Sequence, residues 1–162
     1  MKGTTARALN VPFWITVVLL SFTLFAGLNS VPVLAAADTA IRFRAVDVYV
    51  DSKEKPLAAY QLELSAKEGR AKIVGIEGGE HPAFKEPPFY DPKAMQQDRV
   101  IIAAFNTSPA GKLPKGKTRV ATVHVQSIGD GQPEFAVKVE TAGTVNGKKI
   151  KVGASFEERK AQ

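Results

Sequence analysis

Few side chains in this sequence could carry chemistry. Cysteine is absent, which removes thiol nucleophiles, thiolate metal ligands and disulfides together. The two histidines, His81 and His124, belong to no helix-spaced or short metal-binding motif. Acid–base catalysis needs groups of matched pKa held close together, whereas the carboxylates of this chain are scattered along it. We therefore expect no catalytic residue, no metal site and no cofactor.

The best candidate for a binding site is the segment 80–98. It contains four prolines, which fix too many φ angles and remove too many backbone donors for a central strand. Loops of this length are uncommon in compact domains unless they have a function. Its aromatic rings offer flat surfaces that suit sugars or partner side chains. The candidate ligand- or partner-binding residues are His81, Phe84, Phe89, Tyr90 and Asp91.

Each of these candidates also has a structural interpretation. The aromatic rings could close over the core as a lid, and Asp91 could cap a short turn that starts at Pro92. The basic runs 112–119 and 148–151 have the plain interpretation of solvated turns. Asn106-Thr107-Ser108 fits a glycosylation acceptor, a pattern that is common by chance. No helix rich in basic residues is present to favour nucleic-acid binding.

Residues 1–37 have the order of a secretion signal. Lys2 and Arg7 precede the uncharged apolar stretch 11–28, and small residues follow at 35–37. We expect cleavage after Ala37, although 11–28 approaches the length of an uncleaved membrane anchor. Either alternative exports residues 38–162 to the periplasm or beyond, with membrane contact only through the N-terminal segment if it stays uncleaved.

The mature segment 38–162 has the composition of one folded domain. Charged residues make up 23% of the chain and hydrophobic residues 44%. The formal net charge of +6 includes two positive charges of the leader, so the mature part is only mildly basic. This balance would favour contact with anionic polymers, but it is also ordinary for a soluble surface.

Alternating residues predict strands along most of this segment. Tyr60, Leu62 and Leu64 alternate with polar residues, so one face of that strand is core and the other wet. The segment 119–127 alternates in the same way, with Thr122, His124 and Gln126 on its wet face. By contrast, 100–105 has apolar residues on both parities, which favours a strand buried on both faces or packed under the long loop.

The turn signals between these runs define the fold class. Asn146-Gly147 is a strong hairpin signal before a last strand that is expected to include Ile150 and Val152. No amphipathic helix accompanies the predicted strands. The sequence therefore predicts an all-β protein, a jelly-roll or immunoglobulin-like β-sandwich of about seven to nine strands after the N-terminal signal segment.

Five stretches share alternation patterns and small residues: Val46-Asp47-Val48-Tyr49-Val50, Leu57 to Leu64, Ala71 to Gly79, Val100 to Phe105 and Lys117 to Val125. The first three resemble the opening strands of the cohesin family, and the last two resemble its central strands. The likeness covers roughly residues 43–152.

The resemblance implies a non-catalytic binding module, since cohesins and the related carbohydrate-binding modules are not enzymes. A cohesin-like domain would recognise a protein partner through an exposed sheet face or the long loop. Polysaccharide binding by the same fold is the alternative, and a structural subunit of an envelope assembly is a third. The chain has no tryptophan outside the leader, which disfavours a flat polysaccharide platform.

Overall fold

The computed structural model describes residues 40–67, 71–129 and 131–159, which belong to one unit, Ala37–Gln162. The predicted leader 1–37, its apolar stretch 11–28 and the expected cleavage position lie outside the described residues. In the part of the chain that the structure describes, no helix is long and apolar enough to cross a membrane.

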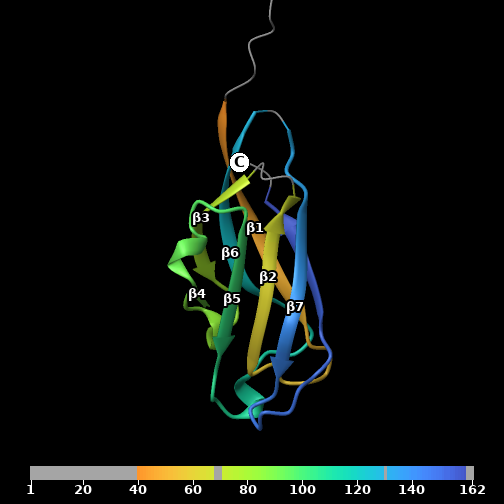
Figure 1. Cartoon of the computed structure of the whole chain (residues 1–162). Coiled ribbons are helices and arrows are strands. Elements are labelled where there is room, and N and C mark those ends of the chain that lie inside the picture. Colours follow the sequence, from red (N-terminus) through yellow and green to blue (C-terminus); the bar gives the residue numbers. More distant parts are fainter. Residues whose placement is uncertain (1–39, 68–70, 130, 160–162) are drawn as a thin grey trace, which may run out of the picture. The chain divides into compact units, whose positions relative to one another are not determined.

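The described residues form two antiparallel sheets of four strands each, so the predicted all-β sandwich is confirmed (Figure 1). Sheet A has the order β3 (Ala71–Gly78), β6 (Lys117–Ile128), β1 (Ile41–Asp51), β8 (Gly153–Glu158). Sheet B has the order β4 (Phe89–Tyr90), β5 (Arg99–Phe105), β2 (Ala59–Ala66), β7 (Phe135–Gly143). Short 3-10 turns whose bounds fall within the described residues are η2 (Pro82–Phe84), η3 (Pro92–Ala94) and η4 (Ala110–Lys112).

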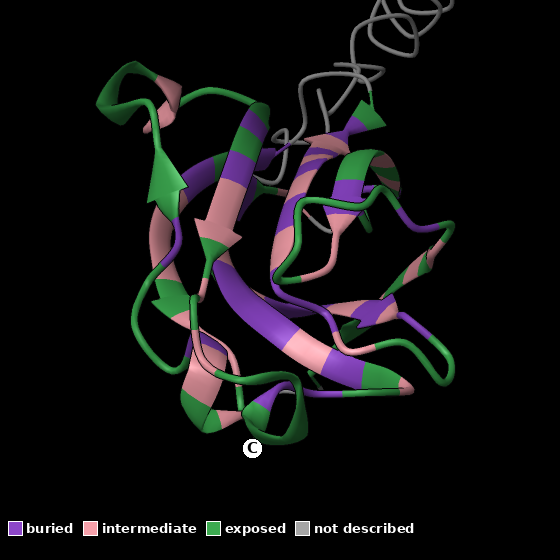
Figure 2. Cartoon of the chain, turned by 90° about the horizontal axis from the view of Figure 1, so that it is seen from below, coloured by how far each residue is buried: buried purple, intermediate pink, exposed green. Residues whose placement is uncertain are grey.

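The core lies between the inward faces of the two sheets (Figure 2). Because successive side chains of a strand point to opposite faces, every second residue of β2 enters this layer, as predicted. Tyr60, Leu62, Leu64 and Ala66 are all buried. The Tyr60 hydroxyl donates a hydrogen bond to the carbonyl oxygen of Val120 at 3.1 Å, and burial raises the pKa of this phenol. Its single polar atom is thus satisfied inside the core.

A bulge between β1 and β6 changes the face of sheet A on which Arg119 lies. The register runs from Ile41 opposite Ile128 and shifts after Val48, so that Tyr49 lies opposite Arg119. Both Val120 and Ala121 are buried as a result. Strict alternation would place Arg119 on the core face with Ala121, but the bulge turns it to the outer face.

The proline-rich loop is partly regular. It contains η2, the two-residue strand β4 and η3, where the sequence predicts an irregular loop with a helical turn over 92–96. The last strand begins at Gly153, so Ile150 and Val152 precede it, contrary to the prediction. The reason is local: the backbone N–H of Ile150 donates to the carbonyl oxygen of Ala142, near the end of β7, at 3.0 Å, and Ile150 does not join the β1 ladder.

Of the two alternatives for 100–105, burial on both faces is wrong, and the long loop pairs with the edge of β5 without covering its outer face. Val100 and Ile102 point into the core, but Ile101 is 41% exposed and Phe105 66% exposed. The outward-pointing side chains of β5 stay exposed because β4 pairs with β5 at the edge of sheet B, opposite Ala103 and Ile102. Strand β4 therefore does not cover the outer face of the sheet. An apolar strand face is therefore left in contact with water.

Candidate functional site

The candidate site is an open groove on the outer face of sheet B, beside β4 and β5. Its volume is about 670 Å³. The apolar part of its lining consists of Phe89, Tyr90, Ala94, Ile101 and Ala103. The polar part consists of Gln61, Asp91, Lys93, Gln97, Asp98 and Arg99. A groove of this size with an apolar floor and a few polar groups is the usual form of a binding site.

An exposed aromatic pair extends one end of the groove. The rings of Phe89 and Phe105 are stacked, with centroids 6.1 Å apart and planes 11° from parallel. Phe89 is 69% exposed, although both residues are large and apolar. With Ile101 they form a continuous apolar strip, and burial of such a strip against a partner would release the ordered water around it.

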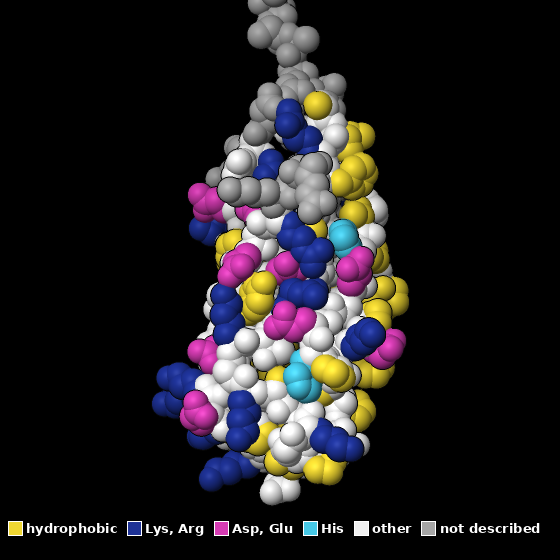
Figure 3. All heavy atoms as spheres, turned by 180° about the vertical axis from the view of Figure 1, so that it is seen from behind, with side chains coloured by type: hydrophobic (Ala, Val, Ile, Leu, Met, Phe, Trp, Pro, Cys, Tyr) yellow, Lys and Arg dark blue, Asp and Glu magenta, His cyan; other side chains and the backbone are white. Residues whose placement is uncertain are grey.

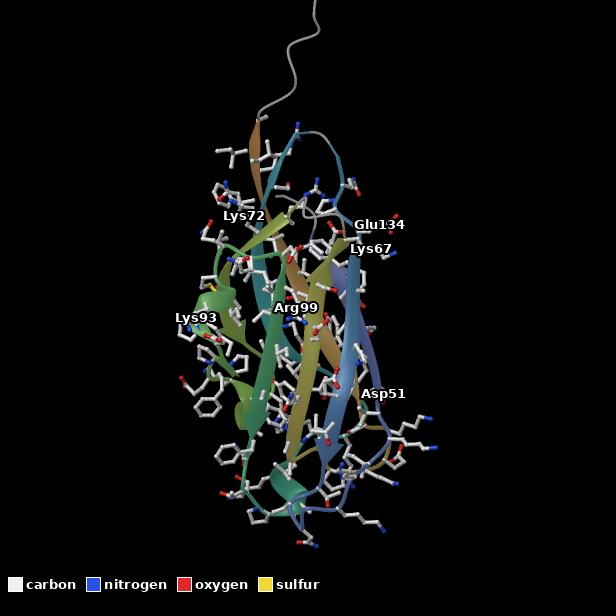
Figure 4. All side chains as sticks on the ribbon, in the orientation of Figure 1. Asp51, Lys67, Lys72, Lys93, Arg99 and Glu134 are labelled. Atoms are coloured by element: carbon white, nitrogen blue, oxygen red, sulfur yellow. The ribbon has the colours of Figure 1, made fainter. Side chains whose placement is uncertain are left out.

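Charged groups border the apolar strip on its other side. The side chains of Lys93 and Arg99 lie on η3 and at the start of β5 (Figure 4). The Arg99 guanidinium donates to the Glu63 carboxylate at 3.1 Å, an exposed ion pair that orients it across the neighbouring strand. The apolar strip and its charged border have the layout of a protein interface, in which a polar rim surrounds an apolar core.

Short side-chain caps shape the loop that carries this aromatic pair. The His81 Nδ1 atom accepts a hydrogen bond from the backbone N–H of Ala83 at 3.1 Å, at the start of η2. Asp91 Oδ1 accepts one from Lys93 N at 2.9 Å at the start of η3. Both side chains thus satisfy the free donors at the start of a turn.

The five candidate residues of the sequence separate into two groups. Phe89, Tyr90 and Asp91 line the groove. Phe84 is buried and packs edge-on against the Tyr60 ring, with centroids 5.3 Å apart, so it closes the core as a lid would. His81 caps η2 and does not line the groove.

Sequence reasoning missed Ile101 and Phe105. The available signal was the run 100–105, whose apolar residues occupy both parities. That pattern predicts a strand buried on both faces or packed under the long loop, but it also fits a strand with one face exposed for binding.

Asn106 connects the long loop to the end of β5. Its Nδ2 donates to the carbonyl oxygen of Ala83 at 3.0 Å, and its Oδ1 accepts from Ser108 N at 2.8 Å. The amide nitrogen, which a glycan would occupy, is therefore engaged within the protein. This geometry favours a structural role for Asn106 over glycosylation.

Replacement of this side chain should loosen the loop. We expect Asn106→Ala to lower the free energy of unfolding by about 1 kcal/mol, because two hydrogen bonds are lost. Urea unfolding measures the change. Ser108→Ala is the matched control, since it destroys the glycosylation pattern but keeps the backbone N–H that Asn106 accepts from. Equal destabilisation by the two variants would contradict the assigned role.

A second polar cluster lies on the outer face of sheet A, where basic and acidic side chains lie side by side (Figure 3). Its centre is the buried carboxylate of Asp47. Its Oδ1 accepts from the Thr122 hydroxyl at 2.6 Å, and Arg159 donates to both carboxylate oxygens at 2.8 and 2.9 Å. Arg119 adds a donor to Thr122 at 2.7 Å. The cluster joins β1 and β6 to Arg159, the residue that follows β8.

The electrostatics of this cluster identify Asp47 as a structural counter-ion. Burial would raise its pKa, but the hydrogen bonds from Arg159 and Thr122, with the charges of Arg159 and Arg119, lower it below the usual value. A carboxylate so fully engaged is a poor general base. Thr122 is fully buried under the two arginines, which corrects the prediction that it lies on a wet face.

The second histidine lies on the same sheet face. His124 Nε2 is 3.0 Å from Glu77 Oε1, across β6 and β3; the Glu77 side chain is largely exposed and the His124 side chain is about one third exposed. Gly75, opposite His124 in the register, leaves room beside the ring. Among the described residues, no three His, Asp or Glu side chains are grouped as metal ligands.

Fold and groove together define the class: a two-sheet antiparallel β-sandwich with an open aromatic groove on one sheet face. Comparisons with protein-family models, with curated proteins and with solved structures find no match for this chain.

Proposed function

We propose that this protein is a non-catalytic, exported binding module that recognises a protein partner through the groove on sheet B. The observation that carries the proposal is the strip of Phe89, Phe105 and Ile101, which stays exposed on a sheet whose opposite face is fully used by the core. Exposed aromatic side chains in a continuous patch are typical of the centre of protein interfaces.

The chemistry of the groove supports a protein over a small polar ligand. Stacked phenyl rings have no hydrogen-bonding groups, so their contribution comes from buried apolar area. The charged border supplied by Asp91, Lys93 and Arg99 can pair with complementary charges of a partner and fix its orientation. The residue patterns that resemble cohesins, and the leader-like residues 1–37, support an exported module of this kind.

A polysaccharide is the second candidate, because the near-parallel rings of Phe89 and Phe105 form a flat apolar surface on which a sugar ring can stack. The same groove would then hold a short glycan, with Gln61 and Gln97 as hydrogen-bonding groups. A structural subunit of an envelope assembly is the third, and it would associate with itself.

The test is affinity capture from the envelope and secreted fraction of the producing cell. The bait with Phe89→Ala and Phe105→Ala should retain the partner at least tenfold more weakly than the unaltered bait, because truncation of central aromatic residues commonly costs about 2 kcal/mol or more. Phe43→Ala is the matched control: Phe43 is also 69% exposed, but it lies on sheet A.

The outcomes separate the three candidates. Loss of one protein from the double variant, with retention by Phe43→Ala, supports protein recognition. If the retained species resists protease but is lost after glycan-degrading treatment, the groove binds carbohydrate instead. Recovery of the bait protein alone, with a mass in solution that rises with concentration, would indicate self-assembly. If the Phe43→Ala bait loses the partner to the same extent, the groove is excluded as the binding site.

A further inference from the structure

The positive charge of this protein is concentrated at one end of the sandwich. Three segments meet there: 51–58 after β1, 106–118 before and at the start of β6, and 143–153 between β7 and β8. Together they contain eight lysines and only two acidic residues. The rest of 38–162 contains twelve Lys and Arg against fourteen Asp and Glu, so the excess charge of the domain comes from this end. The eight are Lys53, Lys55, Lys112, Lys115, Lys117, Lys148, Lys149 and Lys151.

Backbone hydrogen bonds hold the three segments together. Ser52 N donates to the carbonyl oxygen of Gly116 at 3.1 Å, and Gly116 N donates to that of Lys53 at 2.6 Å. Ala58 N donates to the carbonyl oxygen of Gly143 at 2.9 Å. Residues far apart in the sequence therefore form one surface, which we call the lysine end. In Figure 4, side chains with nitrogen tips project from it near the labelled Asp51.

The charge of the lysine end is largely unneutralised. In the described part of the chain, only Lys117 of the eight lysines forms an ion pair, at 2.6 Å with Glu157. The carboxylate of Asp51, one of the two acids, accepts a hydrogen bond from Lys53 N at 2.9 Å and so caps a turn. Gathering unpaired like charges raises the electrostatic energy of the folded state, so fold stability gives no reason for it.

The residue types indicate the chemistry of the partner. All the cations of the three segments are lysines, which act as compact, hydrated point charges. Arginine, whose planar guanidinium can form two parallel hydrogen bonds to one anion, is absent from them. These segments also contain no aromatic residue on which a nucleic-acid base could stack. Separated point charges on flexible stems suit a chain of separated carboxylates better than stacked bases or a bidentate phosphate.

We propose that the lysine end binds an acidic polysaccharide, a polymer with carboxylate groups along its chain. This surface is separate from the groove on sheet B, and the proposal is independent of the partner bound there. Binding is electrostatic, so it weakens steeply with salt and tolerates variation in sugar type.

The test uses the full chain in non-ionic detergent and immobilised polygalacturonate as probe, with a neutral galactan as reference. The pair Lys148→Gln and Lys149→Gln should weaken retention about tenfold, and the slope of log affinity against log salt should become less negative by one to two. The control pair, Lys72→Gln and Lys85→Gln, removes the same charge from exposed sites elsewhere and should leave the slope unchanged.

Each contrary result overturns the proposal. Equal losses from the two pairs would mean that net charge alone causes retention. Equal retention on the neutral galactan would mean that charge is not involved. Tighter binding of single-stranded DNA than of polygalacturonate, measured at the same salt concentration, would assign the lysine end to nucleic acid. Thermal unfolding of every variant checks that the fold is intact.

Discussion

Gly78→Ala is expected to lower the free energy of unfolding by at least about 3 kcal/mol. A Cβ atom at this position would lie 1.8 Å from the carbonyl oxygen of Lys85, which is backbone and cannot rotate away. The loop would have to move off β3, and this would withdraw Phe84 from the core, a loss comparable to a large core truncation. Urea unfolding, with tyrosine fluorescence as signal, measures the change.

Gly111→Ala is the control for this effect. Its Cβ atom would meet nothing within 4 Å, so a change within about 0.5 kcal/mol is expected. The groove provides a second readout, since Phe89 lies on the same loop beyond Phe84. Gly78→Ala should therefore also weaken partner capture under conditions where the protein remains folded. A stability close to that of the unaltered protein would show that the backbones do not approach so closely.

Asp47→Asn is expected to cost about 2 kcal/mol of unfolding free energy at neutral pH, because two arginines lose the carboxylate that neutralises them. The substitution should also change the acid sensitivity of the fold. The folded-state pKa of Asp47 is lowered below its unfolded value of about 3.9, so the unfolded state takes up its proton first as the pH falls. Its stabilisation is complete above the unfolded pKa and is lost as the pH falls through the lower folded pKa.

The variant should therefore lose stability less steeply than the unaltered protein below about pH 4. Unfolding free energies measured in steps from pH 6 to pH 2 give this slope. Glu134→Gln is the control: Glu134 pairs with Lys67 at 2.8 Å on the surface (Figure 4), where solvent screens the pair, and little change is expected. Parallel pH profiles for Asp47→Asn and the unaltered protein would contradict the assigned role of the cluster.

The two outer sheet faces thus differ in chemical character. The middle of sheet A carries a hydrogen-bonded network of Asp47, Thr122, Arg119 and Arg159. Its exposed apolar side chains, Ile41, Phe43 and Ile128, lie at one end of the sheet, outside that network. Sheet B leaves Phe89 and Phe105 exposed without neighbours that bury them. Networks that satisfy their own groups stabilise a fold, whereas an unsatisfied apolar strip gains free energy only when another molecule covers it. Because the strip on sheet B also borders a groove with charged groups at its edge, we place partner binding there.

The sequence by itself was sufficient for the fold class and for most inward-facing residues. Alternation in β2 and along most of β6 follows from the two-residue period of a strand, which is a local property. Turn caps are local as well: Asp91, next to Pro92, accepts a hydrogen bond from the backbone N–H of Lys93, as the capping interpretation of the sequence predicts. The position of Phe89 and Tyr90 in a proline-rich loop also indicated where the groove lies.

Tertiary structure decided the rest, because it depends on contacts between residues far apart in the sequence. The bulge after Val48 turns Arg119 outward, and Arg159, from beyond the last strand, then covers Thr122. The exposure of β5 depends on whether another layer covers sheet B, which a pattern within β5 cannot reveal. In the same way, the lysine end exists only because turns from three parts of the chain meet. Local periodicity determines which way a side chain faces on its strand, but only packing determines whether that face is covered.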